Sequence, residues 1–218
     1  MKIVRYTAAL MALSGLLLLG LVGYKIWDPF AGARQTAAQQ KLEQTWDGAP
    51  PAIAAAPAGT SGPARASQEC VPSLNPSTGT YFAIIQIPAL GKNWKFTVIQ
   101  GTTLTQLSTG PGHIVGTPYP GQQGNVGIAA HDVTAGNPFL YLASLKPDDK
   151  IIVTTKDCVT TYQVNKPSFR VLYTDVAVLN PQGTAHTITL VTCWPTNVLY
   201  FVQHRTIVQG TEVSSVKR

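Results

Sequence analysis

A cysteine at the end of a β-branched stretch is the residue of this chain best placed to do chemistry. Residues 187–192 are mostly β-branched or aliphatic and predict a strand. Cys193 follows directly, and Pro195, which cannot donate a ladder hydrogen bond, ends the strand. A thiol at the last rung of a strand can meet a substrate, so Cys193 is a candidate nucleophile. Considered alone, it could equally be a small buried apolar residue.

The Thr-Leu-Val-Thr-Cys run at 189–193 resembles the active-site strand of sortases, the cysteine transpeptidases of bacterial surfaces. That family also needs a histidine upstream and an arginine downstream, and His131 and Arg205 stand in this order. The resemblance implies that Cys193 attacks a peptide carbonyl and that His131 protonates the departing amine and deprotonates the incoming one. It also implies that Arg205 and the backbone N–H of Trp194 stabilise the oxyanion.

Other residues of the same types compete for these two roles. The competitors are His113, His186, His204 and Arg170. We favour His131 because it follows Gly-Asn-x-x-Ile-Ala, and Arg205 because it begins the run after the cysteine strand, as in the family.

Weaker similarities to the family extend over nearly all of the region from residue 78 onward. Short turn markers occur at 87–90, 101–102, 107–113, 116–117, 120–121 and 124–125, and a Phe-x-x-Leu-x-x-Leu-x-x-Asp pattern follows at 139–148. Each is weak alone, but their order matches. The resemblance implies a mostly β fold, a closed sortase-type barrel with one or two short helices.

Two residues beside the candidate site depart from the usual family pattern. His131 lies between Ala130 and Asp132, where the family usually has Gly-His-Arg or a similar triplet. Asp132 could favour the imidazolium or could face solvent. Trp194 could form an aromatic wall of the site or pack on the barrel. We expect Thr192, Trp194 and Ala130 to contact the substrate, and the Cys-Trp-Pro pattern with a short N-terminal anchor is closest to class D or class E sortases.

An uncharged stretch at 6–24 predicts a transmembrane helix, since about 20 apolar residues span the hydrocarbon core. Lys2 and Arg5 precede it, which places the N-terminus in the cytoplasm and the rest outside. We therefore expect residues 1–27 to be a cytoplasmic tip and signal anchor in the cell membrane. A signal peptide cleaved after Ala-Gly-Ala at 31–33 is the alternative.

The remainder divides by composition into a linker and a strand-rich domain. Residues 31–46 predict a short helical stalk, and the Ala/Pro/Gly-rich stretch at 47–77 predicts a flexible spacer, so 28–77 is expected to be stalk and linker. Residues 78–218 are expected to form the catalytic domain and to fold alone. Its strands are expected at 81–87, 96–100, 125–130, 150–155, 159–164, 176–179, 187–193 and 206–210. One helix is expected at 138–145, capped by Asn137.

Cysteine usage and charge narrow the remaining possibilities. Three cysteines outside the cytoplasm permit one disulfide, and Cys70 with Cys158 could be that pair or could both be free thiols. No zinc-type spacing occurs, so we expect no metal site, and the resemblance to sortases implies that no cofactor is required. The net charge of +6 is scattered and gives no reason to infer a nucleic-acid partner.

The resemblance implies substrates that are sorting-signal peptides of secreted surface proteins. Their signal would be Leu-Pro-x-Thr-Gly or a variant with Ala at the second position, cut between Thr and Gly. The acceptor would be an amine of a peptidoglycan precursor or a pilin. Two alternatives stay open: a sortase-fold binding module without activity, and another exported Cys/His enzyme such as an L,D-transpeptidase, although the Ser-His-Gly-Cys motif of that class is absent.

Overall fold

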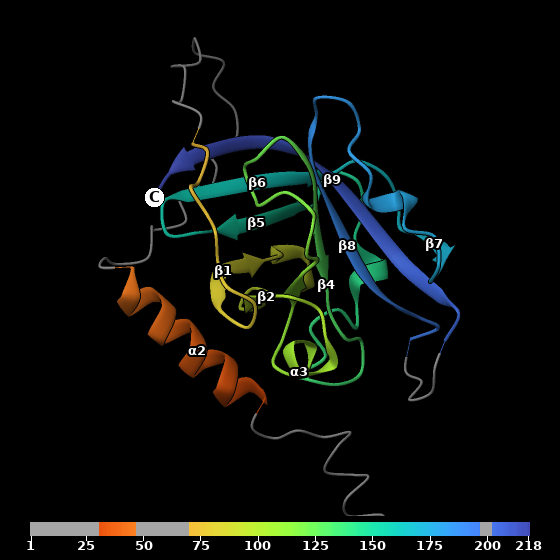
Figure 1. Cartoon of the computed structure of the whole chain (residues 1–218). Coiled ribbons are helices and arrows are strands. Elements are labelled where there is room, and N and C mark those ends of the chain that lie inside the picture. The colour runs from red at the N-terminus through yellow and green to blue at the C-terminus, as the bar shows by residue number, and fades with distance from the viewer. Residues whose placement is uncertain (1–30, 47–69, 197–201) are drawn as a thin grey trace, which may run out of the picture.

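Most of the described chain forms short strands that each bury one face, and these strands pair into a barrel (Figure 1). The computed structural model describes residues 31–46, 70–196 and 202–218. Its strands are β1 (Tyr81–Gln86), β2 (Lys95–Gln100), β3 (Gly112–His113), β4 (Gly124–Ala129), β5 (Lys150–Thr154), β6 (Cys158–Val164), β7 (Phe169–Leu172), β8 (His186–Trp194) and β9 (His204–Lys217). Its helices are α2 (Ala31–Thr45) and α3 (Leu104–Leu107), with 3₁₀ turns η1 (Pro88–Leu90), η2 (Leu142–Ser144) and η3 (Ala177–Leu179).

Eight of these strands form a closed ring in the order β6-β5-β1-β2-β3-β4-β8-β9, and β9 pairs back to β6. The β2–β3 and β4–β8 pairs are parallel and the others antiparallel. β7 pairs with β9 outside the ring and forms its rim (Figure 1). The expected mostly β closed barrel is confirmed.

The interior of the ring is apolar because alternate residues of each strand point inward. β6 shows this directly, with buried and half-buried residues in strict alternation. Ile188 and Leu190 of β8 and Val208 of β9 belong to this core. Inward positions on β8 are therefore even-numbered, and the odd-numbered Cys193 lies on the outer face.

The expected strand at 176–179 is wrong, because this segment is the 3₁₀ turn η3. The Asp175 carboxylate accepts a hydrogen bond from the Ala177 N–H at 3.1 Å, which favours a turn. The Val178 carbonyl then accepts from Asn125 Nδ2 at 2.9 Å and Gln209 Nε2 at 3.1 Å. η3 thus covers the outer face of β4, β8 and β9 behind the strand ends.

The expected helix at 138–145 is also wrong, since only η2 and the turns before it form there. Asn137 has φ +56°, a left-handed conformation rather than the extended one of an N-cap. The Phe139 N–H donates to the His131 carbonyl at 3.0 Å instead of entering a helix. β3 and β7, with two and four residues, were not expected from the sequence.

Helix α2 forms where the sequence predicts a helix, but it lies against the barrel rather than projecting as a stalk (Figure 1). Leu42 and Trp46 pack on Ile84 of β1. Gln35 reaches the edge of β2, where its Oε1 accepts from the Thr97 N–H at 2.9 Å and its Nε2 donates to the Thr109 carbonyl. The Gln35 amide therefore pairs with backbone groups at the edge of β2 in the way that a neighbouring strand would.

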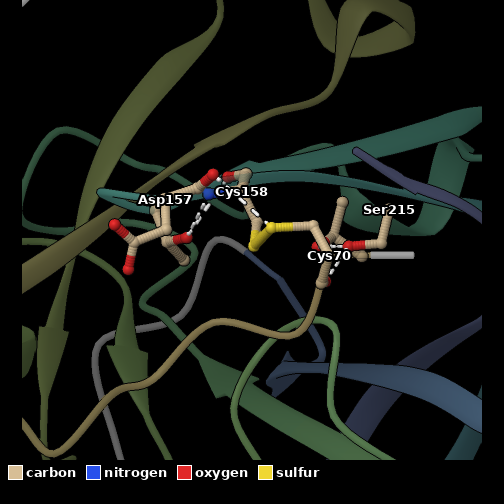
Figure 2. The surroundings of a disulfide bond; sticks show 6 residues. Cys70, Asp157, Cys158 and Ser215 are labelled. Atoms are coloured by element: carbon tan, nitrogen blue, oxygen red, sulfur yellow. Dashed lines mark hydrogen bonds between the residues drawn. A yellow bond between two sulfur atoms is a disulfide. The ribbon is translucent and has the colours of Figure 1, made fainter. Parts of the chain in front are cut away.

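A disulfide joins Cys70 to Cys158, the first residue of β6, with Cα atoms 5.8 Å apart (Figure 2). Figure 2 shows Ser215 of β9 beside it, where the Ser215 Oγ donates to the Cys70 carbonyl at 2.6 Å. The sequence did not decide whether these two cysteines pair, and the structure shows that they do. Cys193 is free.

The expected membrane anchor at 6–24 and the spacer residues 47–69 lie outside the described residues. Among the helices that the structure describes, none is long and apolar enough to cross a membrane. The domain boundary at residue 78 stays a prediction, although α2 and Cys70 make contacts across it.

Candidate active site

The ladder between β8 and β9 places Cys193 directly opposite Arg205. Directly opposed residues of an antiparallel pair have Cα atoms about 4.5–5.5 Å apart and point to the same face. The thiol and the guanidinium therefore share the outer face at the open end of these strands. Sequence order alone could not establish this pairing.

His131 reaches the same place from β4, the other neighbour of β8. β4 runs parallel to β8, and its last residue, Ala129, pairs with Val191. The register continues past the end of β4, because the Ala130 N–H donates to the Val191 carbonyl at 3.1 Å and the Thr192 hydroxyl donates to the Ala130 carbonyl at 2.9 Å. Continued by one residue, this register brings His131 alongside Cys193.

Burial is the largest influence on the pKa values of Cys193 and His131. It raises the pKa of the Cys193 thiol above its ordinary value, while the nearby Arg205 charge lowers that pKa and the Asp132 charge raises it. Burial lowers the pKa of His131, and Asp132 partly opposes that shift. Both shifts favour the neutral forms at neutral pH, a thiol at Cys193 and an unprotonated imidazole at His131.

The guanidinium of Arg205 is held by backbone carbonyls at and just before the start of β9. Nη1 donates to the carbonyls of Val202 and His204, both at 2.9 Å. Within the described part of the chain, Nε and Nη2 donate to no protein acceptor. The side chain is thus oriented by two bonds and keeps donors for a substrate oxygen. The ring of Tyr173, which the sequence did not single out, lies 5.8 Å from the guanidinium carbon.

The three residues expected to contact substrate lie next to the site but differ in exposure. Ala130 and Thr192 are buried, and the hydrogen bond between them joins β4 to β8. Trp194 is half-buried, with the Arg170 guanidinium carbon 4.0 Å from its ring centre and the His204 ring at 5.8 Å. Their contact with substrate stays a prediction.

Two of the competing histidines are engaged elsewhere, whereas His204 lies at the same strand ends as the ladder partner of Trp194. His113 is buried, and its ring nitrogens contact the Gln100 Oε1 and the Pro118 carbonyl, both at 2.9 Å. His186 lies 3.3 Å from Glu212, at the far end of β8. Asp132 is only 3% exposed, so the alternative that it faces solvent is wrong.

No set of three His, Cys, Asp or Glu side chains in the described residues could hold a metal ion. What the strand ends bring together is a thiol, an imidazole and a guanidinium. These are the groups that a cysteine acyl-transfer enzyme needs as nucleophile, proton donor and oxyanion donor.

Comparison with known proteins agrees with this class. Residues 85–213 match the family model described as "Sortase domain". Sortase D of Bacillus subtilis is 25% identical over 203 residues, which cover 92% of this chain and 94% of that protein. Among solved structures, sortase E from Streptomyces avermitilis is 32% identical with a TM-score of 0.58, covering 65% of this chain and 93% of that one. The SrtF sortase from Corynebacterium diphtheriae is 25% identical with a TM-score of 0.62, covering 68% and 92%.

The chain belongs to the sortase family, whose members are cysteine transpeptidases. Its similarity to sortases D and E agrees with the class that the Cys-Trp-Pro pattern indicates. Membership of this family rules out the L,D-transpeptidase alternative.

Proposed function

We propose that this protein is a membrane-anchored sortase in which Cys193 is the nucleophile, His131 the general acid and base, and Arg205 the oxyanion donor. The observation that carries the proposal is the convergence of these residues from three adjacent strand ends. Cys193 and Arg205 are ladder partners, and the β4–β8 register leads to His131. A fold-stabilising role alone would not require a half-buried free thiol at this position.

The reaction proceeds in two balanced halves. The Cys193 thiolate adds to the carbonyl carbon between Thr and Gly of the sorting signal, and Arg205 donates to the resulting oxyanion. The carbon–nitrogen bond breaks as His131 gives its proton to the leaving amine, which leaves a thioester on Cys193. An incoming amine then gives up a proton to His131, attacks the thioester and releases the thiolate.

The acyl part of the signal is proposed to lie on the outer face of β4 and β8. Ala129 and Val191, which pair there, are half-buried and apolar. On the side away from Cys193, the side chains of Ile114 and Leu179 cover this face at Gly127. A Cβ added at Gly127 would meet them at 3.0 Å and 3.2 Å. Only a short apolar segment fits between Gly127 and Cys193, which suits a signal of Leu-Pro-x-Thr-Gly or Leu-Ala-x-Thr-Gly.

The anchor proposal rests on residues 6–24 and the preceding positive charges. It places the barrel outside the membrane, where the Cys70–Cys158 disulfide is stable. Surface-protein sorting signals and an amine of a peptidoglycan precursor or a pilin would be the two substrates there.

A peptide panel tests the proposed specificity. Fluorogenic peptides carrying Leu-Pro-x-Thr-Gly and Leu-Ala-x-Thr-Gly are incubated with the protein and an amine, and products are identified by mass. We expect cleavage between Thr and Gly and transfer of the new carboxyl end to the amine. Cleavage at another bond, or of neither peptide, would overturn the proposal.

A further inference from the structure

A hollow on the opposite face of the same strand ends has no role in the chemistry proposed above. Its volume is about 270 Å³, and it is lined by Ala143, Ser168, Phe169, Arg170 and Thr206. η2 supplies Ala143, β7 supplies Phe169 and Arg170, and β9 supplies Thr206.

The hollow is tied to the two residues that flank the nucleophile. Thr206 is the ladder partner of Thr192, which precedes Cys193. Arg170 is the ladder partner of Thr206, and its guanidinium carbon lies 4.0 Å from the ring centre of Trp194, which follows Cys193. Within the sheet, the hollow therefore covers β9 and β7, the first and second strands beyond β8, or two strand spacings of about 10 Å in total.

Its polar groups are suited to an anion. The Thr206 side chain is 2% exposed, and its Oγ1 has no hydrogen-bond partner among the described residues. The Arg170 guanidinium adds a fixed positive charge with several donors. The Ser168 hydroxyl already donates to the Ala143 carbonyl at 3.1 Å, so its oxygen is left to accept. None of the lining residues is acidic.

The position of the hollow favours the amine side of the reaction. The acyl segment is proposed to lie over β4 and β8 on the outer face, whereas the hollow lies over β9 and β7 on the opposite face. We propose that it binds a carboxylate carried by the incoming amine substrate, with Arg170 and Thr206 as donors and the Ser168 oxygen accepting an amide N–H. This inference rests on the proposed transpeptidase function and names a chemical class for its acceptor.

Two acceptors that differ only in charge test this proposal. Triglycine spans about 10 Å when extended, comparable to two strand spacings, and triglycinamide lacks only its carboxylate. We expect wild-type protein to transfer the acyl group to triglycine with a kcat/KM about fivefold or more above that for triglycinamide, as one charge-assisted contact would give. Equal use of both acceptors would overturn the proposal.

Substitutions then assign the preference to the hollow. Arg170→Gln should abolish the preference for triglycine while hydrolysis of the sorting peptide without acceptor continues. Lys166→Gln is the matched control, because it removes an exposed positive charge four residues away whose amine lies over the Phe169 ring. A preference that survives Arg170→Gln, or that Lys166→Gln removes equally, would contradict a specific role for Arg170.

A second variant separates ligand binding from folding. Thr206→Val keeps the shape and removes a buried hydroxyl without a protein partner, so the denaturation midpoint should be unchanged or higher while the preference for triglycine falls. A lower midpoint with an unchanged preference would show that the hydroxyl is structural.

The bound carboxylate could belong to the acceptor or to the leaving segment of the sorting peptide. Two sorting peptides distinguish these sources: the leaving segment of one ends in a free carboxylate, and that of the other ends in an amide. If Arg170→Gln raises KM only for the carboxylate form, the hollow binds the leaving segment and the acceptor assignment is wrong. If no hydrolysis occurs even in wild-type protein, the proposed function itself fails, which is distinct from loss of acceptor preference.

Discussion

Cys193 faces Arg205 across the β8–β9 ladder, while the next residue, Trp194, faces Arg170 on the other side of the sheet. Strand alternation separates two arginines that lie close together in the ladder. Arg205 therefore shares the face of Cys193, whereas Arg170 lies on the face of Trp194.

Substitution of Arg205 distinguishes oxyanion stabilisation from general charge. Arg205→Ala should lower kcat for peptide cleavage by about 10²-fold or more with little change in stability, as loss of an oxyanion donor does. Arg205→Lys should recover only part of the rate, because an ammonium lacks the planar fork. Lys217→Ala, an exposed cation on the same strand, serves as the control. A fully active Lys variant would contradict the oxyanion role.

The pH dependence of cleavage should reflect the shifted pKa values of His131 and Cys193. Burial lowers the pKa of His131 and raises that of Cys193. The product of thiolate and imidazolium populations is greatest between those pKa values. We expect kcat/KM to form a broad bell whose acid limb lies below pH 6.5 and whose alkaline limb lies above the ordinary thiol pKa, about 8.5. A narrow optimum between those values would show that burial does not control the pair.

Asp132 should shift both limbs of that bell in one direction. Its charge raises the pKa of His131 and also that of Cys193. In Asp132→Asn both pKa values fall, so the acid limb and the alkaline limb should both move to lower pH. Limbs that move in opposite directions, or stay in place, would exclude an electrostatic effect of this carboxylate on the pair.

The disulfide is expected to stabilise the fold without taking part in turnover. Cys70→Ala should lower the free energy of unfolding by about 2–5 kcal/mol, since 88 residues separate the two cysteines. Activity at temperatures where the variant is folded should equal that of wild type, and Cys158→Ala should behave alike. Urea denaturation with and without reductant measures the effect. An unchanged midpoint on reduction would contradict it.

Helix α2 is expected to be part of the folded unit. Gln35→Ala removes the partner of the Thr97 N–H, a residue with no exposed surface, and should cost about 1–3 kcal/mol. Gln40→Ala, an exposed glutamine of the same helix, should have little effect. Deleting residues 1–30 should preserve the urea midpoint, whereas deleting residues 1–46, which removes α2 but keeps Cys70, should lower it. Equal midpoints for both truncations would show that the barrel is independent of α2.

Much of the barrel could be predicted from the sequence because its strands are β-branched runs between turn residues. β3, with two residues, is too short to produce such a pattern, and the β-branched run at 176–179 forms a turn because Asp175 and tertiary contacts of Val178 outweigh strand propensity.

The candidate site was predicted as three residue identities, but their arrangement was not. Pairing of Cys193 with Arg205 depends on register, which residues far apart in sequence decide together. The hollow likewise depends on where η2 and β7 lie against β9. The docking of Gln35 on β2 could not be foreseen, because a polar glutamine in a weakly amphipathic helix indicates exposure.

The mass of the protein during turnover tests the central claim most directly. Mixed with a sorting peptide in the absence of an amine, wild-type protein should gain the mass of the peptide up to Thr, held as a hydroxylamine-sensitive thioester that maps to Cys193. Cys193→Ala should gain no mass and cleave no peptide while retaining its unfolding midpoint, because loss of one half-buried sulfur removes little packing. An adduct on another residue, or turnover by the Cys193→Ala protein, would contradict the account.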